Sequence, residues 1–175
     1  EAMRGDVTEM EHMLDEYLDF ARGEGGEESL VSDLGDIVNE AVAAAGRAKF
    51  AGADRIAVDA APGIRLAVKR NALRRCTTNL IDNALKYGTH ASVALKRNSH
   101  MVEIVVDDDG PGIAPDRREE AFRPFHRLDE GRNLQAGGSG LGLAIARDIA
   151  RAHGGDLTLG ESPQGGLSAV IRLPV

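Results

Sequence analysis

The chain has 175 residues, 42% of them hydrophobic, which suffices for one domain with its own core and a short additional segment. Its formal net charge of −7 argues against a general nucleic-acid or anionic-membrane surface, because such surfaces need clustered cations. A single cysteine, Cys76, excludes an intramolecular disulfide and a cysteine-rich metal site. No apolar run approaches the roughly 20 residues that span a bilayer, so we expect a cytoplasmic fragment without membrane contact.

A heptad pattern in residues 1–22 predicts a first helix. Its apolar stripe recurs at alternating steps of four and three: Met3, Val7, Met10, Leu14, Tyr17 and Ala21. One such helix is not stable alone in water, so the stripe should pack on another helix, on a second copy of the chain in a weak homodimer, or on its own domain. Residues 23–31, rich in Gly and Glu, predict a linker, and residues 32–175 then form a second domain.

The first half of that second domain predicts two helices with two strands between them. Ser32 or Asp33 can cap a helix over the following dozen residues. Residues 55–60 alternate as a half-buried strand, and a Pro-Gly turn leads to another strand over 64–68. A long helix over 69–87 follows.

The helix over 69–87 carries a polar stripe beside its apolar one. At 100° per residue, one arc holds the apolar side chains that should face the core: Leu73, Cys76, Leu80 and Ala84. Asn79, Asn83 and Lys86 fall on an adjacent narrow stripe. Two amides and an amine should therefore point together at the edge of the core.

The second half of the domain predicts strands on both sides of a long irregular segment. Residues 112–138 lose all periodicity, and a segment of this length inside a compact domain is usually functional or disordered. The regular elements expected around it are strands over 90–97 and 101–107, a helix over 140–153, and strands over 156–160 and 167–173.

The strand over 101–107 runs into an acidic, glycine-rich turn, DDGPGI at residues 108–113. The Asp108 carboxylate can accept a hydrogen bond from an exocyclic amine, while Gly110 and Gly112 let a flat ring approach the backbone. The alternative is a tight turn after an edge strand. If the ligand is a purine nucleoside triphosphate, Asp108 accepts the adenine amino group and opposes guanine, which predicts ATP over GTP.

Asn83 and Lys86 can meet the phosphate end of such a ligand. The Asn83 amide oxygen is a hard ligand suited to Mg²⁺, and Lys86 supplies a point charge for phosphate. The alternatives are a structural hydrogen bond for Asn83 and a solvated surface position for Lys86.

A glycine run at residues 137–142 stands directly before the helix over 140–153. It offers backbone N–H groups and the positive end of a helix dipole, both matched to phosphate, although helix packing alone also favours glycine. The preceding segment has the character of a lid. Its expected apolar anchors are Phe122 and Phe125, and its candidate phosphate contacts are Arg123, Arg127 and Arg132.

Four segments, in order and spacing, resemble the boxes of sensor histidine kinases of two-component systems, a family related to gyrase-type topoisomerases and mismatch-repair ATPases. They are Asn79–Tyr87 (N box), Asp108–Ile113 and Gly138–Ile145 (glycine boxes) and Phe122–Phe125 (F box). The resemblance covers about residues 32–175, and residues 109–115 and the C-terminus are most similar to EnvZ-type osmosensor kinases. It implies an α+β fold: an α/β sandwich of a mixed β-sheet packed on helices, preceded by the end of a dimerisation helix.

The resemblance also implies ATP and Mg²⁺ as cofactors and assigns roles through the boxes. Asn79, Asn83 and Lys86 would be catalytic, with Asn83 also at the metal. The nucleotide-binding residues would be Asn83, Lys86, Tyr87, Asp108, Gly110, Gly112, Ile113, Arg127, Gly138, Ser139, Gly140, Leu141 and Gly142.

The activity implied is a kinase that presents the γ-phosphate of ATP to a histidine on a dimerisation domain, for relay to a response regulator. No segment resembles the acceptor-histidine motif. We therefore expect an excised piece of a kinase, or a natural protein lacking the acceptor, with weak or no autophosphorylation alone; inner-membrane anchoring of the full-length protein stays open. Hydrolysing relatives place a glutamate where Asn79 stands, and an amide cannot take a proton, which predicts slow ATP hydrolysis.

Two other functions stay open at this point. A domain of this fold can act as a non-catalytic module that binds a regulator or dimerises. The second alternative is an ATPase clamp of the gyrase type. Against it, position 79 is an asparagine instead of the glutamate of such ATPases, and no transducer domain is found.

Overall fold

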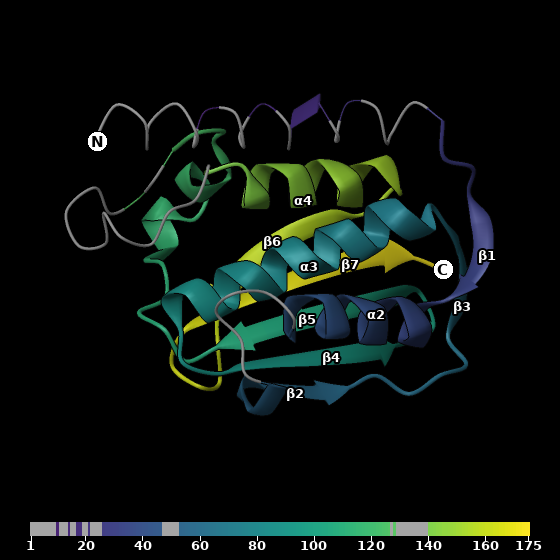
Figure 1. Cartoon of the computed structure of the whole chain (residues 1–175), viewed down its shortest axis with the longest axis horizontal. Coiled ribbons are helices and arrows are strands. Elements are labelled where there is room, and N and C mark those ends of the chain that lie inside the picture. The colour runs from purple at the N-terminus through teal and green to yellow at the C-terminus, as the bar shows by residue number, and fades with distance from the viewer. Residues whose placement is uncertain are drawn as a thin grey trace.

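The computed structural model describes residues 10, 14, 17, 18, 21, 26–46, 53–126, 128 and 140–175. In this part of the chain, helices lie over one face of a β-sheet in two layers (Figure 1). The covering helices are α2 (Leu34–Gly46), α3 (Arg70–Tyr87) and α4 (Gly142–Ala152). This arrangement confirms the expected α+β sandwich.

The main sheet is mixed and has the strand order β2-β4-β5-β7-β6. Strands β2 and β4 pair in parallel, whereas the other neighbours pair antiparallel. Its members are β2 (Ile56–Asp59), β4 (Ala91–Arg97), β5 (Met101–Asp108), β6 (Asp156–Glu161) and β7 (Leu167–Pro174). Every strand and helix expected between residues 55 and 175 is present, with ends shifted by one or two residues.

The central strand β5 positions the site through its alternation. Val102, Ile104 and Val106 are buried on the face that the helices cover. Because side chains alternate across a strand, Asp108 at the end of β5 belongs to the same face and is only 3% exposed. The alternation of β5 therefore places the Asp108 carboxylate at the edge of the apolar core.

Helix α3 buries the apolar arc expected from its sequence. Leu73, Cys76, Leu80 and Ala84 are at most 2% exposed. The Cys76 thiol donates a hydrogen bond to the Ala146 carbonyl of α4 at 3.2 Å, and burial raises its pKa far above the ordinary value. Cys76 is thus a buried structural thiol, as expected.

A short strand that the sequence did not indicate, β1 (Leu30–Asp33), pairs antiparallel with β3 (Arg65–Val68) in a separate two-stranded sheet. Leu30 and Val31 are both more than 60% exposed, so β1 lacks the alternation that marks a half-buried strand. Asp33 caps α2, because its Oδ1 accepts the Gly35 N–H at 2.9 Å. The Ser32 hydroxyl donates to the Leu30 carbonyl instead.

The predicted heptad stripe of the first helix is described at a few positions. Met10, Leu14 and Tyr17 are helical and more than half exposed, so these three positions are not part of the buried core. Met3, Val7 and residues 23–25 of the expected linker lie outside the described residues. None of the described helices combines the length and the apolar character that a membrane crossing would need.

Candidate functional site

A cavity of about 290 Å³ opens between the C-terminal end of α3, the end of β5 and the start of α4. This volume is near the lower end of the range for small-molecule sites. The cavity brings together eight of the residues that the sequence assigned to a site: Asn83, Lys86, Tyr87, Asp108, Gly112, Ile113, Gly140 and Gly142. Their convergence from three separate elements makes this cavity the candidate functional site.

Asp108 is the most strongly constrained group in the cavity. Its Oδ1 accepts the N–H of Gly110 at 2.9 Å and the N–H of Leu167 at 3.0 Å. Burial raises the pKa of this carboxyl group, while the two backbone hydrogen bonds oppose that rise. Because both of these N–H groups go to Oδ1, the second oxygen, Oδ2, is left to meet a hydrogen-bond donor of a ligand.

Two residues that hold Asp108 were not identified from the sequence. Leu167 donates its N–H to the carboxylate, and the Gly166 N–H donates to the Asp108 carbonyl at 3.2 Å. A Cβ atom at Gly166 would collide with the Asp108 carboxylate and lie 2.6 Å from the Gly110 nitrogen. The sequence signal was the Gly-Gly pair before the last strand, which is indistinguishable from an ordinary hairpin turn.

The glycines after Asp108 allow close approach of backbones. A Cβ atom at Gly110 would lie 2.9 Å from the Tyr87 carbonyl oxygen, so a side chain there would push the end of α3 away. Gly112 has a φ of 68°, which favours glycine, and it lines the cavity. Gly110 itself does not line the cavity; its contribution is the N–H that it donates to Asp108.

Helix α3 brings Asn83, Lys86 and Tyr87 to the cavity from its last turns. The Lys86 ammonium lies 5.2 Å from the centre of the Tyr87 ring. Asn79 is half-buried one turn before Asn83 and does not line the cavity. The polar stripe of α3 therefore reaches the cavity only over its C-terminal part.

Arg55 and Asp109 fix the C-terminal end of α3 from the outside. The Arg55 guanidinium donates to the carbonyls of Leu85, Gly88 and Thr89 at 2.6 to 3.1 Å. The Asp109 carboxylate accepts the N–H groups of Thr89 at 2.6 Å and His90 at 2.8 Å. These bonds satisfy backbone groups that a helix end leaves unpaired, and so hold the turn that carries Lys86.

The Asp109 contacts predict a measurable acid dependence of stability. Hydrogen bonds from the His90 backbone and ring lower the pKa of Asp109 to about 2. The unfolded value is about 3.9, so the ionised carboxylate stabilises the fold above pH about 4, and this contribution is lost as the pH falls towards 2. We expect Asp109→Asn to unfold at lower denaturant than the parent at pH 6, with a difference that shrinks between pH 4 and 2.

Denaturant titrations across this pH range would measure the effect, with Asp148→Asn, an exposed carboxylate on α4, as the control. A stability difference that stays constant from pH 6 to pH 2 would show that the ionised Asp109 is not what holds this turn.

The start of α4 forms the opposite wall of the cavity. Gly140 has a φ of 70°, and Gly140 and Gly142 both line the cavity. Leu141, the residue that caps α4, is buried and has no side-chain acceptor for the first backbone N–H groups. The predicted site residues Arg127, Gly138 and Ser139, together with Arg132, lie outside the described residues.

Residues of the segment between β5 and α4 form another wall of the cavity, and the sequence predicted few of them. Phe122 packs against the core, as expected of an anchor, whereas Phe125 is 61% exposed and is not one. Phe125 has a φ of 62° and donates its N–H to the Gly140 carbonyl, which ties the middle of the segment to the residues just before α4. The lining residues missed from the sequence are Pro111, Ala114, Arg117, Ala121, His126, Leu128, Leu143 and Leu167.

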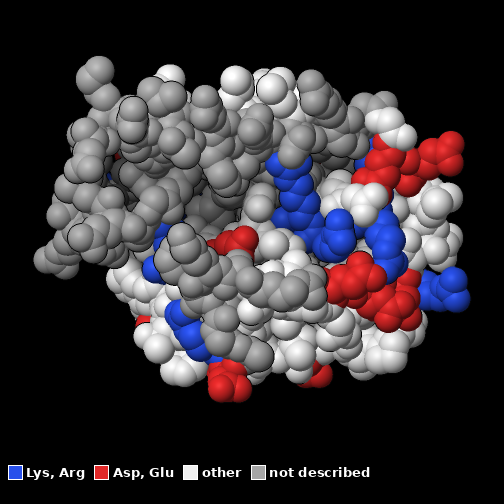
Figure 2. Space-filling model, viewed as in Figure 1, with Lys and Arg blue, Asp and Glu red and all other residues white. Residues whose placement is uncertain are grey.

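The described surface carries side chains of both charges, as expected for a chain with a net charge of −7. Figure 2 shows Lys and Arg side chains in separate groups with Asp and Glu beside them, rather than one continuous basic field, over the described part of this face. Such mixed charge does not favour counterion release from a nucleic acid.

Comparison with models of protein families shows to which family this chain belongs. The model of the histidine kinase-, DNA gyrase B- and HSP90-like ATPases matches residues 68–175, more than half of the chain. The chain belongs to this family. The matched region starts at the last residue of β3 and includes every described residue that lines the cavity. The cavity is thus part of the ATPase domain itself.

Two curated relatives of this chain are sensor histidine kinases by name. The sensor histidine kinase CpxA of Escherichia coli K12 is 45% identical over 106 residues, which is 60% of this chain and 23% of CpxA. The sensor-like histidine kinase SenX3 of Mycolicibacterium smegmatis is 32% identical over 180 residues, which is 99% of this chain and 47% of SenX3. The chain therefore spans less than half the length of these relatives.

Solved structures of the family agree with the fold. The NMR structure of the histidine kinase domain of the Escherichia coli osmosensor EnvZ matches with a TM-score of 0.61 and 35% identity, over 86% of this chain and 92% of that chain. The expected resemblance to sensor histidine kinases is confirmed, and the domain is the ATP-binding module of such a kinase.

Proposed function

We propose that this chain binds Mg-ATP in the cavity and delivers the γ-phosphate to a histidine on a dimerisation domain, for relay to a response regulator. The observation that carries the proposal is the Asp108 carboxylate, buried at the cavity and oriented by two backbone N–H groups on one oxygen. A fixed acceptor at the end of a cavity flanked by Gly112 and Ile113 is suited to a flat ring with an exocyclic amine.

Adenine is the ring that fits this acceptor. Its amino group can donate to Asp108 Oδ2, whereas guanine carries a carbonyl at the corresponding position and would oppose the carboxylate. Burial of Asp108 strengthens both effects, because an unpaired buried polar group is costly. The site should therefore select ATP over GTP.

The phosphates would extend from the adenine site towards Lys86 and the start of α4. Lys86 lines the cavity from α3, and Gly140 and Gly142 line it from the α4 side. Backbone N–H groups at a helix start and the positive end of its dipole favour phosphate. We assign Gly138, Ser139, Leu141 and Arg127 to the same phosphate-binding group, on the sequence resemblance alone.

The donor set fits one Mg²⁺ ion held mainly by the nucleotide. In the described part of the chain no group of three or more His, Cys, Asp or Glu side chains is placed to hold a metal. Asn83 offers one amide oxygen at the cavity, so phosphate oxygens and water would supply the other ligands. Bound Mg²⁺ would neutralise charge on the phosphates.

The chemistry left to this chain is positioning. The cavity residues bind the base, orient the phosphates and exclude water, while the attacking histidine belongs to another domain. Asn79 and Asn83 carry amides, which cannot accept the proton of an attacking water, so we expect transfer to a histidine to exceed hydrolysis. Two relatives are named sensor histidine kinases, which supports transfer of the phosphoryl group to a histidine.

The test is phosphoryl transfer in trans. The chain is incubated with Mg²⁺, γ-labelled ATP and a separate dimerisation domain that carries an acceptor histidine. We expect label on the dimerisation domain only when the chain is present, and loss of that label with Asn83→Ala. If the chain binds ATP but never labels a histidine, delivery to that acceptor is wrong and the domain acts as a nucleotide-binding module.

A further inference from the structure

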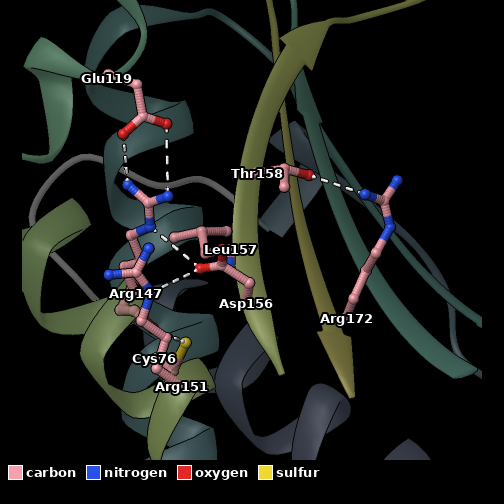
Figure 3. Close-up of polar contacts among 9 residues, drawn as sticks. Cys76, Glu119, Arg147, Arg151, Asp156, Leu157, Thr158 and Arg172 are labelled. Carbon is pink, nitrogen blue, oxygen red and sulfur yellow. Dashed lines mark hydrogen bonds and ion pairs between the residues drawn. The ribbon is translucent and has the colours of Figure 1, made fainter. Parts of the chain in front are cut away.

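Arg147 on α4 is the centre of a group of charged side chains beside the cavity (Figure 3). Its two terminal nitrogens donate to the two Glu119 oxygens at 2.9 and 3.4 Å, and its Nε donates to Asp156 Oδ1 at 3.1 Å. Arg151 donates to the same Asp156 oxygen at 3.1 Å. The side chain of Arg147 is only 15% exposed, although its partners lie nearer to solvent.

The flat face of the same guanidinium stacks on an aromatic ring. The Arg147 Cζ atom lies 4.2 Å from the centre of the Phe122 ring, within the range of a cation–π contact. Phe122 ends the short helix η3 (Glu120–Phe122) and packs against the core. Arg147 thus contacts the Glu119–Phe122 segment in two ways: the edge of its guanidinium hydrogen-bonds to Glu119, and the face of the guanidinium stacks on Phe122.

The two elements that Arg147 joins each form one wall of the cavity. Ala121 lies between the contacts at Glu119 and Phe122 and lines the cavity from one side. Leu143, one turn before Arg147 on α4, lines it from the other. Arg147 itself does not line the cavity, so any effect it has on a ligand must act through these walls.

We propose that Arg147 is a positioning residue for the nucleotide site, setting the spacing between the Glu119–Phe122 wall and the start of α4. The inference rests on the proposed function, since it takes a nucleotide as the ligand of the cavity. An exposed ion pair alone would contribute little, and Glu119 is 81% exposed. The role depends instead on one largely buried guanidinium that makes a two-pronged contact and a stacking contact together.

Arg147→Met tests the role without leaving a buried charge unpaired. Glu119 is exposed, and Asp156 keeps its hydrogen bond from Arg151, so the variant should fold. The matched control is Arg172→Met. Arg172 on β7 donates to Glu103 at 2.8 Å and to Thr158 at 3.4 Å, but alternates with the buried Ile171 and Leu173 and so lies on the sheet face away from the helices (Figure 3).

Two measurements separate positioning from simple structural support. Calorimetric titration with Mg²⁺ and a non-hydrolysable ATP analogue should show Kd raised about fivefold to tenfold in Arg147→Met and unchanged in Arg172→Met. Arg147→Lys, which keeps charge but loses the planar fork, should resemble Arg147→Met more than the parent. Methyl NMR of the nucleotide-free chain should show shifted Ala121 and Leu143 signals in Arg147→Met only.

The inference is overturned if Arg147→Met binds the analogue as Arg172→Met does and leaves the Ala121 and Leu143 methyl signals unchanged. Failure of the unsubstituted chain to bind the analogue would overturn the proposed function instead. In that case the methyl spectra of the nucleotide-free variants alone decide whether Arg147 sets the spacing of the walls.

Discussion

Asp108→Asn should weaken ATP binding about 100-fold while leaving the fold intact. The amide oxygen of an asparagine can still accept the N–H groups of Gly110 and Leu167, which now go to one carboxylate oxygen. The amide nitrogen then takes the place of Oδ2 and presents donors to the donor amine of adenine. The substitution therefore replaces a hydrogen-bond acceptor by a donor on the side that faces the ligand, and it keeps the hydrogen bonds from Gly110 and Leu167.

Calorimetry and thermal unfolding on the same samples would measure this effect. The control is Asp107→Asn, the adjacent aspartate, which alternation places on the opposite sheet face and which does not line the cavity. Unchanged ATP affinity in Asp108→Asn would show that Asp108 does not contact the base.

Gly166→Ala should damage both stability and nucleotide binding. A Cβ atom there would collide with the Asp108 carboxylate and with the Asp108 carbonyl that accepts the Gly166 N–H. Overpacking of this kind costs about 3 kcal/mol of unfolding free energy, and the displaced carboxylate should also lose its ligand geometry. We expect a lowered denaturation midpoint together with ATP affinity reduced at least as much as in Asp108→Asn.

Gly160→Ala is the matched control, because a Cβ atom at Gly160 on β6 would meet nothing within 4 Å. Denaturant titration and calorimetry of both variants would make the comparison. If Gly166→Ala retained the stability and affinity of Gly160→Ala, the packing of Gly166 against Asp108 would not constrain the site.

Local patterns were enough to predict most of the fold and the centre of the site. The period of two in β5 and the arc of α3 each follow from a single element, so Asp108, Asn83 and Lys86 could be placed near one another. The same reasoning placed Asn79 with them. The structure leaves it outside the cavity lining, because the stripe runs along α3 while the cavity meets only the last turns.

The remaining features could not be predicted because they depend on contacts between distant segments. Gly166 and Leu167 meet Asp108 only because β7 pairs with β5 in one register. Strand β1 has no core-facing alternation and exists through its pairing with β3. Arg147 reads as one of several helix arginines until the fold brings Glu119 and Phe122 against it.

The most direct test of the central claim is a calorimetric titration of the chain with a non-hydrolysable ATP analogue, with and without Mg²⁺, and with the GTP analogue beside it. The account predicts saturable binding of the adenine nucleotide, strengthened by Mg²⁺, and much weaker binding of the guanine nucleotide. Equal binding of both nucleotides would contradict the role of Asp108 as the base-selecting acceptor, and no binding of either would contradict the nucleotide site itself.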